Sequence, residues 1–332
     1  MKRVIGGTLL ASAGVPLVLD DLAGEVAIVT GASRGLGLEL ARELSRHSVR
    51  LVICARNASA LDEATDKLRA DGAEVTAVAC DITEEPSARL LIDTALATYG
   101  RLDIIVNNAG IIQVGPVANN QFSDYESAMR TMALAPARLT LAALPAMRER
   151  GHGRILNVTS IGGKISVPHL LPYCMAKFAA VAFSEGLRAE LGSGPITVTT
   201  AVPGLMRTGS HTQAMFRGQR EKEFTWFSLS ASLPLISMDA TRAARRIVSA
   251  MRSRQAEVII TPVAQLAARG AAIFPGLTAR VLHAVSATLP EAAGKPGELA
   301  RGEELRPALS GRLFDRLTAM GRSAARRLNE VR

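Results

Sequence analysis

The chain has 332 residues, of which 48% are apolar, 4% aromatic and 21% charged. This length and apolar content can fill a large globular core, and they exclude a disordered or collagen-like chain. The three cysteines, Cys54, Cys80 and Cys174, follow no zinc spacing and cannot all pair. A disulfide-stapled secreted module is therefore disfavoured, and we expect a reducing, cytoplasmic compartment.

The formal net charge of +9 is not spread evenly along the chain. Residues 1–210 carry equal numbers of basic and acidic side chains, so the whole excess lies in residues 211–332. A neutral body with an arginine-bearing C-terminal part favours contact with an anionic membrane surface or an acidic partner. Nucleic-acid binding is disfavoured because the expected helices carry no aromatic and basic platform for stacked bases.

An apolar stretch over residues 4–19 follows Lys2 and Arg3. It is shorter than the roughly 20 residues that span a bilayer. The small residues at 11–13 also come too early for an ordinary signal-peptide cleavage site. We expect residues 1–21 to be either a shallow membrane anchor or a helix packed on the body.

From residue 25 onward, short apolar runs alternate with amphipathic helical patterns. The apolar runs lack polar alternation, which is typical of strands covered by helices on both faces of a parallel sheet. We therefore predict one domain over residues 22–262, an α/β fold with a doubly wound, parallel, seven-stranded Rossmann sheet. The expected strands are 26–30, 51–55, 74–79, 103–107, 154–159, 197–202 and 257–261, and clear helical patterns cover 36–46, 58–70, 87–99 and 176–191.

A glycine-rich turn joins the first expected strand to the first expected helix. Glycines let the backbone turn tightly and approach a pyrophosphate, while the helix N-terminus offers free N–H groups and a positive dipole end. The sequence therefore predicts a dinucleotide at this turn. Its residues are Thr30, Gly31, Ala32, Ser33, Arg34, Gly35, Leu36 and Gly37.

The end of the second expected strand indicates which dinucleotide binds. An NAD site usually carries an acidic residue there, which accepts hydrogen bonds from the ribose hydroxyls. This strand ends instead in Ala55 and Arg56, and Arg34 lies in the glycine turn. Two guanidinium groups suit a ribose 2′-phosphate, so NADP(H) is favoured over NAD. The alternative is that Arg56 is an ordinary solvated charge.

Three polar residues follow the fifth expected strand at a suggestive spacing. Ser160 ends that strand, Tyr173 comes 13 residues later, and Lys177 lies 4 residues beyond Tyr173 on one face of a helical pattern. A neighbouring ammonium and a cationic nicotinamide would both favour the phenolate of Tyr173. Tyr173 is therefore a candidate acid/base, with Ser160 bonding the same substrate oxygen.

Read together, these motifs resemble the short-chain dehydrogenases/reductases. The resemblance covers roughly residues 22–262, and the order of the motifs carries it. The matching segments are TGASRGLG at 30–37, NNAG at 107–110, Ser160, YCMAK at 173–177 and PGLMRT at 203–208.

This resemblance implies a role for each matching residue. Tyr173 would be the catalytic acid/base, Lys177 would bind the nicotinamide ribose and lower the tyrosine pKa, and Ser160 would orient the substrate. Further cofactor contacts are implied along the cleft. They are Gly31, Ser33, Arg34, Gly35, Leu36 and Gly37 at the turn, Arg56, Asp81 and Ile82 toward the adenosine, Asn107, Ala109 and Gly110 beside the cofactor, and Pro203, Gly204 and Thr208 around the nicotinamide.

One family position departs from the pattern. Where these enzymes usually carry a catalytic Asn, this chain has Met132, in the segment MALAP at 132–136. That Asn helps to hold a water in the proton relay, whereas a thioether accepts only weak hydrogen bonds. We expect slower or differently relayed catalysis.

The region between Thr208 and Ser237 closes over substrate in this family. Its rings suit either an apolar substrate or simple attachment of the region to the core. Cys174 is expected to be a packed side chain, and His169 is a candidate for the edge of the substrate cleft. The five histidines show no metal spacing, so no metal site is predicted. The rings are Phe216, Phe224, Trp226 and Phe227.

Residues 263–332 form an extension beyond the usual end of the family. We expect a flexible polar linker at 291–310 and a basic amphipathic helix at 312–329. Its apolar face suits a membrane surface or another subunit, which would give a homo-oligomer.

Three hypotheses follow for the function. The first is an NADP(H)-dependent oxidoreductase that interconverts an alcohol and a carbonyl on an apolar small-molecule substrate, cytoplasmic or associated with a membrane. The second is a catalytically weakened Rossmann protein that binds the cofactor in a regulatory role, and it is motivated by Met132. The third treats the basic tail as the main functional element.

Overall fold

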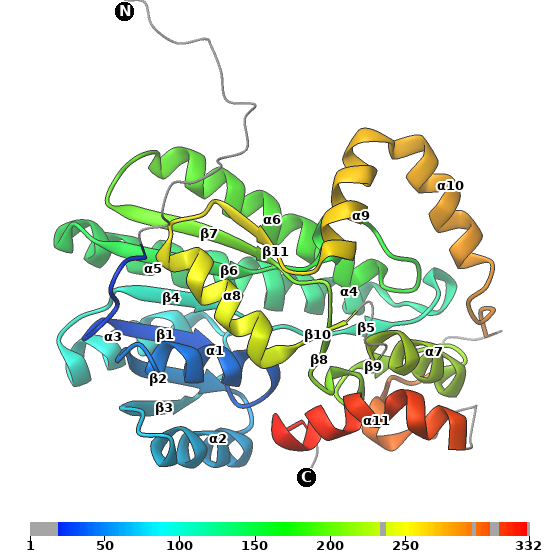
Figure 1. Ribbon diagram of the computed structural model, residues 1–332, viewed down its shortest axis with the longest axis horizontal. Helices are drawn as coiled ribbons and strands as arrows, with labels where there is room; N and C mark the ends of the chain where they lie inside the picture. Colours follow the sequence, from blue (N-terminus) through cyan, green and yellow to red (C-terminus); the bar gives the residue numbers. More distant parts are fainter. Residues whose placement is uncertain (1–18, 233–236, 294–296, 306–311, 331–332) are drawn as a thin grey trace, which may run out of the picture.

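The computed structural model describes residues 19–232, 237–293, 297–305 and 312–330 (Figure 1). The expected anchor or helix at 1–21 falls almost entirely outside these residues. Its last part is described: the Asp20 carboxylate contacts Arg154 at 2.8 Å, and Leu22 is fully buried.

A seven-stranded parallel sheet forms the centre of the molecule, as predicted. The strand order is β11-β7-β6-β4-β1-β2-β3. The five inner strands are rich in β-branched or other apolar residues buried on both faces, which is why the sequence shows no polar alternation there, and the edge strands β3 and β11 are only partly buried. The strands are β1 (Val26–Thr30), β2 (Arg50–Ala55), β3 (Val75–Ala79), β4 (Ile104–Asn107), β6 (Gly153–Val158), β7 (Ile196–Val202) and β11 (Glu257–Ile259).

Helices cover both faces of this sheet (Figure 1). Side chains alternate along β1, so Ala27 and Val29 join one core cluster while Val26 and Ile28 join the other. The first cluster lies under α1 (Gly35–Ser45), α2 (Ala58–Ala70) and α8 (Ala240–Arg252). The second lies under α3 (Glu85–Tyr99), α5 (Ala135–Arg150) and α6 (Leu171–Leu191).

The strand order reverses next to β1. From β1 the chain proceeds outward to β2 and β3, and then returns to β4 on the other side. Connections that leave β1 and β4 toward opposite faces open a crevice at the carboxyl ends of these strands. The topology thus places a ligand crevice where the glycine turn, the NNAG segment and Ser160 come together.

Shorter elements are built over this edge of the sheet. They form two small sheets, in the orders β10-β8 and β12-β9-β5, of which β12 covers Ala300–Arg301. The elements are β5 (Gln113–Val114), η1 (Val117–Asn119), α4 (Phe122–Met129), the π-helical turn η2 (Arg130–Leu134), η3 (Ile161–Gly163), β8 (Leu205–Arg207), η4 (Ser210–Thr212), β9 (Met215–Phe216), α7 (Arg220–Ser232) and β10 (Ser237–Asp239).

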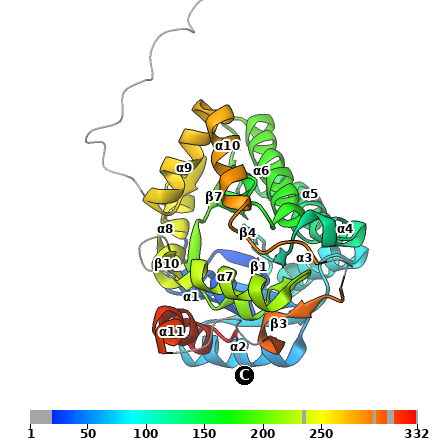
Figure 2. The same ribbon diagram turned by 90° about the vertical axis from the view of Figure 1, so that its right-hand side faces the viewer.

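Two helices of the extension stand out from the body as a hairpin (Figure 2). They are α9 (Pro262–Ile273) and α10 (Pro275–Ser286), and no residue of α10 is buried. The hairpin exposes large apolar side chains, among them Leu266 at 77%, Ile273 at 67% and Phe274 at 59%.

The rest of the extension corrects two expectations. Part of the expected linker is structured, because β12 (Ala300–Arg301) pairs with β9 and runs into η5 (Gly302–Glu304). Helix α11 (Arg312–Arg327) forms as predicted, but it packs on α7 of the same chain. Ala324, Ala325 and Leu328 are buried there, so this part of its apolar face is covered by the body rather than presented to a membrane or a second subunit.

Candidate active site

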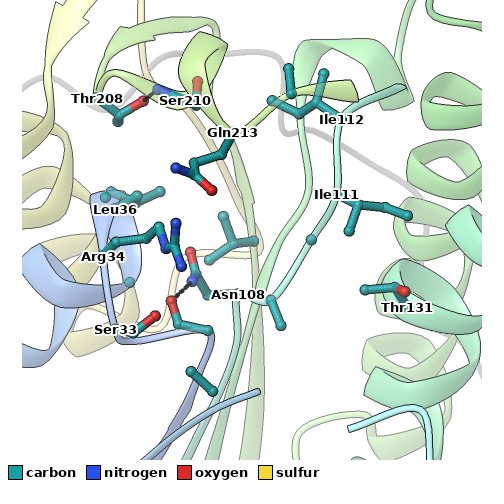
Figure 3. A pocket seen from close by; sticks show the side chains of 18 of the residues that line it. Ser33, Arg34, Leu36, Asn108, Ile111, Ile112, Thr131, Thr208, Ser210 and Gln213 are labelled. Atoms are coloured by element: carbon teal, nitrogen blue, oxygen red, sulfur yellow. Dashed lines mark hydrogen bonds between the residues drawn. The ribbon is translucent and has the colours of Figure 1, made fainter. Parts of the chain in front are cut away.

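A cleft of about 710 Å³ opens at the carboxyl edge of the sheet. Ser33, Arg34 and Leu36 line one side, and Ile111, Ile112 and Thr131 line the other (Figure 3). Of the catalytic residues and cofactor contacts that the family resemblance implies, all but Asn107 lie on its wall. The structure therefore brings seven separate parts of the chain into one cavity of a size that suits a dinucleotide and a small substrate.

The glycine turn provides the floor at the N-terminus of α1. Gly31 and Gly35 adopt φ angles of +65° and +58°, which lie in the left-handed region that glycine tolerates without strain. A side chain on Gly31 would approach the Cα of Ala109 to 2.8 Å, so the NNAG segment can pack closely on the turn. The first turn of α1 contains no acidic residue and no capping side chain. This geometry fits a phosphate group at the helix N-terminus.

Basic side chains lie at the end of the cleft beside β2. Arg34 points into the cavity from the turn (Figure 3), and Arg56 follows β2. The Arg56 guanidinium lies 3.7 Å from the Asp81 carboxylate. Burial raises the pKa of Asp81, but hydrogen bonds from Thr83 and the charge of Arg56 outweigh it and hold the pKa below its usual value. Asp81 is thus held as a carboxylate at the position implied for adenine contact.

The NNAG segment places its two asparagines differently. Asn107 is buried beneath the cleft, where its Nδ2 donates to Thr140 Oγ1 at 3.0 Å and to Asn157 Oδ1 at 2.8 Å. Asn108 lines the cleft, and its Nδ2 donates to the Thr30 carbonyl at 3.0 Å. Asn107 therefore ties β4 to β6 and α5, and its neighbour holds the glycine turn.

Ser160, Tyr173 and Lys177 meet at the far end of the cleft. Ser160 follows β6 and caps η3 by accepting a hydrogen bond from the Gly162 amide at 3.1 Å. Tyr173 and Lys177 lie one turn apart on α6. The Lys177 Nζ donates to the Val158 carbonyl at 2.9 Å and lies 5.8 Å from the centre of the Tyr173 ring.

Burial dominates the titration of this group of residues. It raises the pKa of Tyr173 to about 12, although the Ser160 hydroxyl acts in the opposite direction. It also lowers the pKa of Lys177 to about 8. In the protein without cofactor, desolvation thus raises the Tyr173 pKa above the ordinary phenol value. That the ammonium and a bound cationic nicotinamide together favour the phenolate stays a prediction.

Met132 lies beside Tyr173, as the family alignment implies. It occupies the π-helical turn η2, and it packs in an apolar cluster with Ala128 and Ala176 against the Tyr173 ring. Its neighbour Thr131 turns toward the cleft instead (Figure 3). Single π-helical turns are frequent at functional sites because they re-aim side chains. Sequence reasoning missed Thr131, since a helical pattern does not reveal a π-turn.

The aromatic residues of the region 208–237 form a core rather than a cleft wall. Phe216, Phe224 and Phe227 are buried in one cluster with Cys174, and none of them lines the cavity. His169 also lies outside the lining, where its Nδ1 lies 2.9 Å from the buried Glu223 carboxylate. The simple attachment of this region to the core is the interpretation that the structure supports.

Several residues line the cleft that the sequence did not single out. The nucleotide end includes Asn57, whose side chain caps α2 by accepting from the Ala60 amide. The lining also includes Gln213, which follows η4, Arg301 on β12, and Glu330, which lies after α11. Their sequence neighbourhood contains no motif, so only the fold reveals them.

No helix within the described ranges combines the length and the apolar character needed to cross a bilayer. In those same ranges, no cluster of three or more His, Cys, Asp or Glu residues has a geometry that could hold a metal ion.

Comparisons with known proteins agree with this geometry. Residues 25–217 match the short chain dehydrogenase family. Dehydrogenase/reductase SDR family member 7B of Bos taurus is 31% identical over 264 residues, which make up 77% of this chain and 80% of that protein. Ketoacyl reductase HetN of Nostoc is 32% identical over 186 residues, 56% of this chain and 65% of that protein.

A solved structure shares the fold with similar coverage. A variant of actinorhodin polyketide ketoreductase, crystallised with NADPH, superimposes with a TM-score of 0.62 at 30% identity. The match covers 71% of this chain and 95% of that one. With its seven-stranded parallel sheet, its ordered motifs and these relatives, the chain belongs to the short-chain dehydrogenase/reductase family of oxidoreductases.

Proposed function

We propose that the chain is an NADP(H)-dependent oxidoreductase that interconverts a secondary alcohol and a ketone, or an alcohol and an aldehyde, with Tyr173 as acid/base. The observation that carries the proposal is the meeting of Ser160, Tyr173 and Lys177 at one end of a cleft whose other end is the glycine turn. When bound, the nicotinamide supplies or accepts the hydride.

Proton transfer is the task of the protein. Tyr173 keeps its proton at neutral pH, as an ordinary phenol does, and burial holds that proton more firmly by raising its pKa to about 12. A protonated phenol can donate to the oxygen of a carbonyl that is being reduced, and Ser160 is placed to bond the same oxygen. In the reverse direction, alcohol oxidation, the cationic nicotinamide ring and the Lys177 ammonium would stabilise the Tyr173 phenolate and so offset the cost of its desolvation. The protonated phenol thus suits carbonyl reduction, whereas alcohol oxidation needs the phenolate.

Two observations support NADP(H) as the cofactor. No carboxylate ends β2, and Arg34 and Arg56 both reach the nucleotide end of the cleft. Guanidinium groups match phosphate with paired, charged hydrogen bonds. The residues that would hold the cofactor are the turn residues 31–37, Arg56, Asp81, Ile82, Asn108, Ala109, Gly110, Lys177, Pro203, Gly204 and Thr208.

An apolar substrate fits the remaining wall. Beyond Tyr173 the cleft is lined by Ile111, Ile112, Met206, Ala214 and Met215. These side chains offer contact area and few hydrogen bonds, so they would favour a carbonyl compound with a hydrocarbon body over a sugar-like one.

A substrate screen tests this function. Purified full-length protein is given NADPH or NADH with a panel of aliphatic, cyclic and aromatic ketones and aldehydes, and loss of nicotinamide absorbance is followed. We expect turnover with NADPH on at least one apolar ketone or aldehyde. Cofactor binding without turnover on any of them would favour the second candidate instead.

That second candidate is a cofactor-binding regulatory protein with weakened catalysis. It is favoured by Met132, whose thioether and apolar neighbours stand beside Tyr173 where the family usually places an amide. Slow turnover that rises when an amide is restored at this position would decide for the enzyme.

Peripheral membrane contact is a proposal about the hairpin α9–α10 and the N-terminal segment rather than α11. The hairpin exposes Leu266, Ile273, Phe274 and Leu277, and its sequence contains two arginines and no acidic residue. An apolar surface with positive charge suits an anionic lipid headgroup layer.

A further inference from the structure

The last described residues of the chain lie on the glycine turn. The Gly35 amide donates to the Leu328 carbonyl at 2.9 Å. The Glu330 carboxylate covers the same glycine: its Oε1 lies 2.5 Å from the point where a Cβ on Gly35 would stand. The tail thus uses the two features that let this glycine approach a phosphate, namely its free N–H group and its missing side chain.

Glu330 is buried in this place although one of its carboxyl oxygens makes no hydrogen bond. Its residue is 5% exposed, and its Oε2 has no hydrogen-bond partner. A buried carboxyl oxygen without a partner is costly and calls for an explanation. The positive end of the dipole of α1 stabilises a carboxyl group at this helix N-terminus, and the positive charge of Arg34 acts in the same direction.

Backbone and side-chain contacts fix the segment from both sides. The Asn329 Nδ2 donates to the carbonyls of Ser33 at 3.1 Å and Ala60 at 3.2 Å, and its Oδ1 accepts from Lys67 at 2.9 Å. The Gln213 Nε2 donates to the Glu330 carbonyl at 2.7 Å. The segment is therefore docked by groups from the glycine turn, from α2 and from the residue after η4.

Helix α11 leads the chain to this point through close packing. A side chain on Gly209 would collide with Ala325, and one on Gly321 would come within 2.6 Å of the Ser232 hydroxyl. The Arg327 guanidinium also contacts the Asp239 carboxylate at 2.7 Å. These close approaches place residues 328–330 over the turn.

We propose that residues 328–330 are an internal ligand of the phosphate position at the glycine turn, which a dinucleotide must displace before it binds. This inference rests on the proposed function, because it assumes that the turn receives a dinucleotide. The Glu330 carboxyl and the Leu328 carbonyl take the place of phosphate oxygens, so the free chain is in a self-blocked state. Cofactor binding would then be coupled to release of the C-terminus.

The charged groups around Glu330 make the block sensitive to pH. They are Arg34 on the turn, Lys67 on α2, which donates to the side chain of the neighbouring Asn329, and the ion pair of Arg301 and Glu303 at the rim of the cleft. Burial raises the pKa of Glu330 to about 8, against the effect of Arg34. The blocked state therefore binds a proton more tightly than the open state. It is favoured below the ordinary glutamate pKa, and it loses this advantage as pH rises toward about 8.

Amide hydrogen exchange on the full chain tests the displacement directly. The reporters are the backbone amides of Gly35, Leu328 and Glu330. The Leu328 amide donates to the Ala324 carbonyl, and the Glu330 amide donates to the Ala325 carbonyl. We expect saturating NADPH to speed exchange at residues 328–330, and inorganic pyrophosphate at high concentration to do so more weakly. Bound NADPH that leaves these amides unchanged or slows their exchange would overturn the inference, since the tail would then be a clamp over the cofactor.

Variants separate this inference from the proposed function. Glu330→Ala should lower the apparent Kd for NADPH about tenfold, as expected for a tail that is closed about nine-tenths of the time. Glu298→Ala, an exposed glutamate of the same extension, should leave the Kd unchanged. Equal affinity in all three proteins would defeat the inference alone, whereas absence of NADPH and NADH binding in all three would defeat the proposed function as well.

A pH series gives a second readout. The affinity of the wild-type chain, relative to Glu330→Gln, should rise between about pH 5 and pH 8, because only the wild type must lose a proton from the blocked state. A constant ratio across this range would contradict the assigned role of the carboxyl.

Discussion

The Lys177 ammonium lies 5.8 Å from the centre of the Tyr173 ring, and it donates its hydrogen bond to the main-chain carbonyl of Val158. The lysine is thereby fixed between the end of β6 and the wall of the cleft. Burial raises the pKa of the Tyr173 phenol to about 12 and lowers the pKa of the Lys177 ammonium to about 8. These opposite pKa shifts lead to one prediction for Tyr173 and another for Lys177.

Removal of the Tyr173 hydroxyl should abolish most turnover. Tyr173→Phe keeps the ring and its packing against Met132, so we expect kcat to fall about 10²- to 10⁴-fold while NADPH affinity stays within about threefold. Steady-state kinetics with fluorescence titration of NADPH would measure both. Tyr125→Phe on α4 is the matched control and should be neutral; a fully active Tyr173→Phe variant would refute the assigned acid/base.

Replacement of Lys177 should change how stability depends on pH. The pKa of Lys177 is lowered to about 8 in the folded protein, so the unfolded chain binds more protons between about pH 8 and the ordinary lysine pKa near 10.5. The wild-type free energy of unfolding should therefore gain about 2–3 kcal/mol from this residue between pH 7 and pH 10.

The Lys177→Met variant has no titrating group at this position, so its free energy of unfolding lacks this gain between pH 7 and pH 10. It also loses the hydrogen bond to the Val158 carbonyl, but this loss lowers its stability equally at both pH values. Denaturant unfolding of both proteins at pH 7 and pH 10 would give the difference. Parallel pH curves for the wild type and Lys177→Met would show that the ammonium is not penalised by burial.

An amide in place of Met132 should restore part of the family's relay. We expect Met132→Asn to raise kcat several-fold, and to lower stability by about 1–3 kcal/mol because a polar amide enters an apolar cluster. Met132→Leu preserves the apolar volume and should leave kcat unchanged. If Met132→Asn and Met132→Leu turn over equally, a missing amide does not limit this protein.

Loss of Arg56 should affect one cofactor and spare the other. Arg56→Ala removes a charged donor to a 2′-phosphate, so we expect NADPH affinity to fall about 10- to 100-fold with little change for NADH. Arg89→Ala, an exposed arginine paired with Asp93 on α3, serves as the control. An equal loss for both cofactors would point to an effect on the strand end rather than on phosphate recognition.

Binding to anionic vesicles should depend on the hairpin α9–α10. Phe274→Glu adds a negative charge to its apolar surface, and we expect the bound fraction in vesicle sedimentation to fall at least threefold. Phe122→Glu makes the same change on α4, at a phenylalanine that is 77% exposed, and should have no effect. Equal sedimentation of the two variants would exclude the hairpin as the contact.

The sheet was predictable because its signal is local. Residues such as Ile28 and Ile53 belong to runs buried on both faces, and each run is followed by a helical pattern, so strand number and class follow from periodicity. The turn at Gly31 and the pair Tyr173 and Lys177 were found for the same reason. Their spacing within one element determines their relative placement.

What the sequence left open depends on contacts between distant elements. The sequence analysis placed Asn107 beside the cofactor, whereas Asn108 lines the cleft. Both residues lie at the end of β4, where a shift by one residue reverses the direction of the side chain. The apolar face of α11 was visible in the sequence, but its covering by α7 was not. Nothing near Glu330 indicates that it meets Gly35, because close approach across the fold leaves no local pattern.

The meeting of Asn329 with Ser33 has a consequence for biosynthesis. The turn that opens the first βα unit is completed by side chains made 296 residues later. While the chain leaves the ribosome, the Rossmann layers can assemble from the N-terminus onward, since domains form as they emerge. Closure of this turn must wait until residues 328–330 have been made, so a chain that terminates before them would carry a permanently open turn.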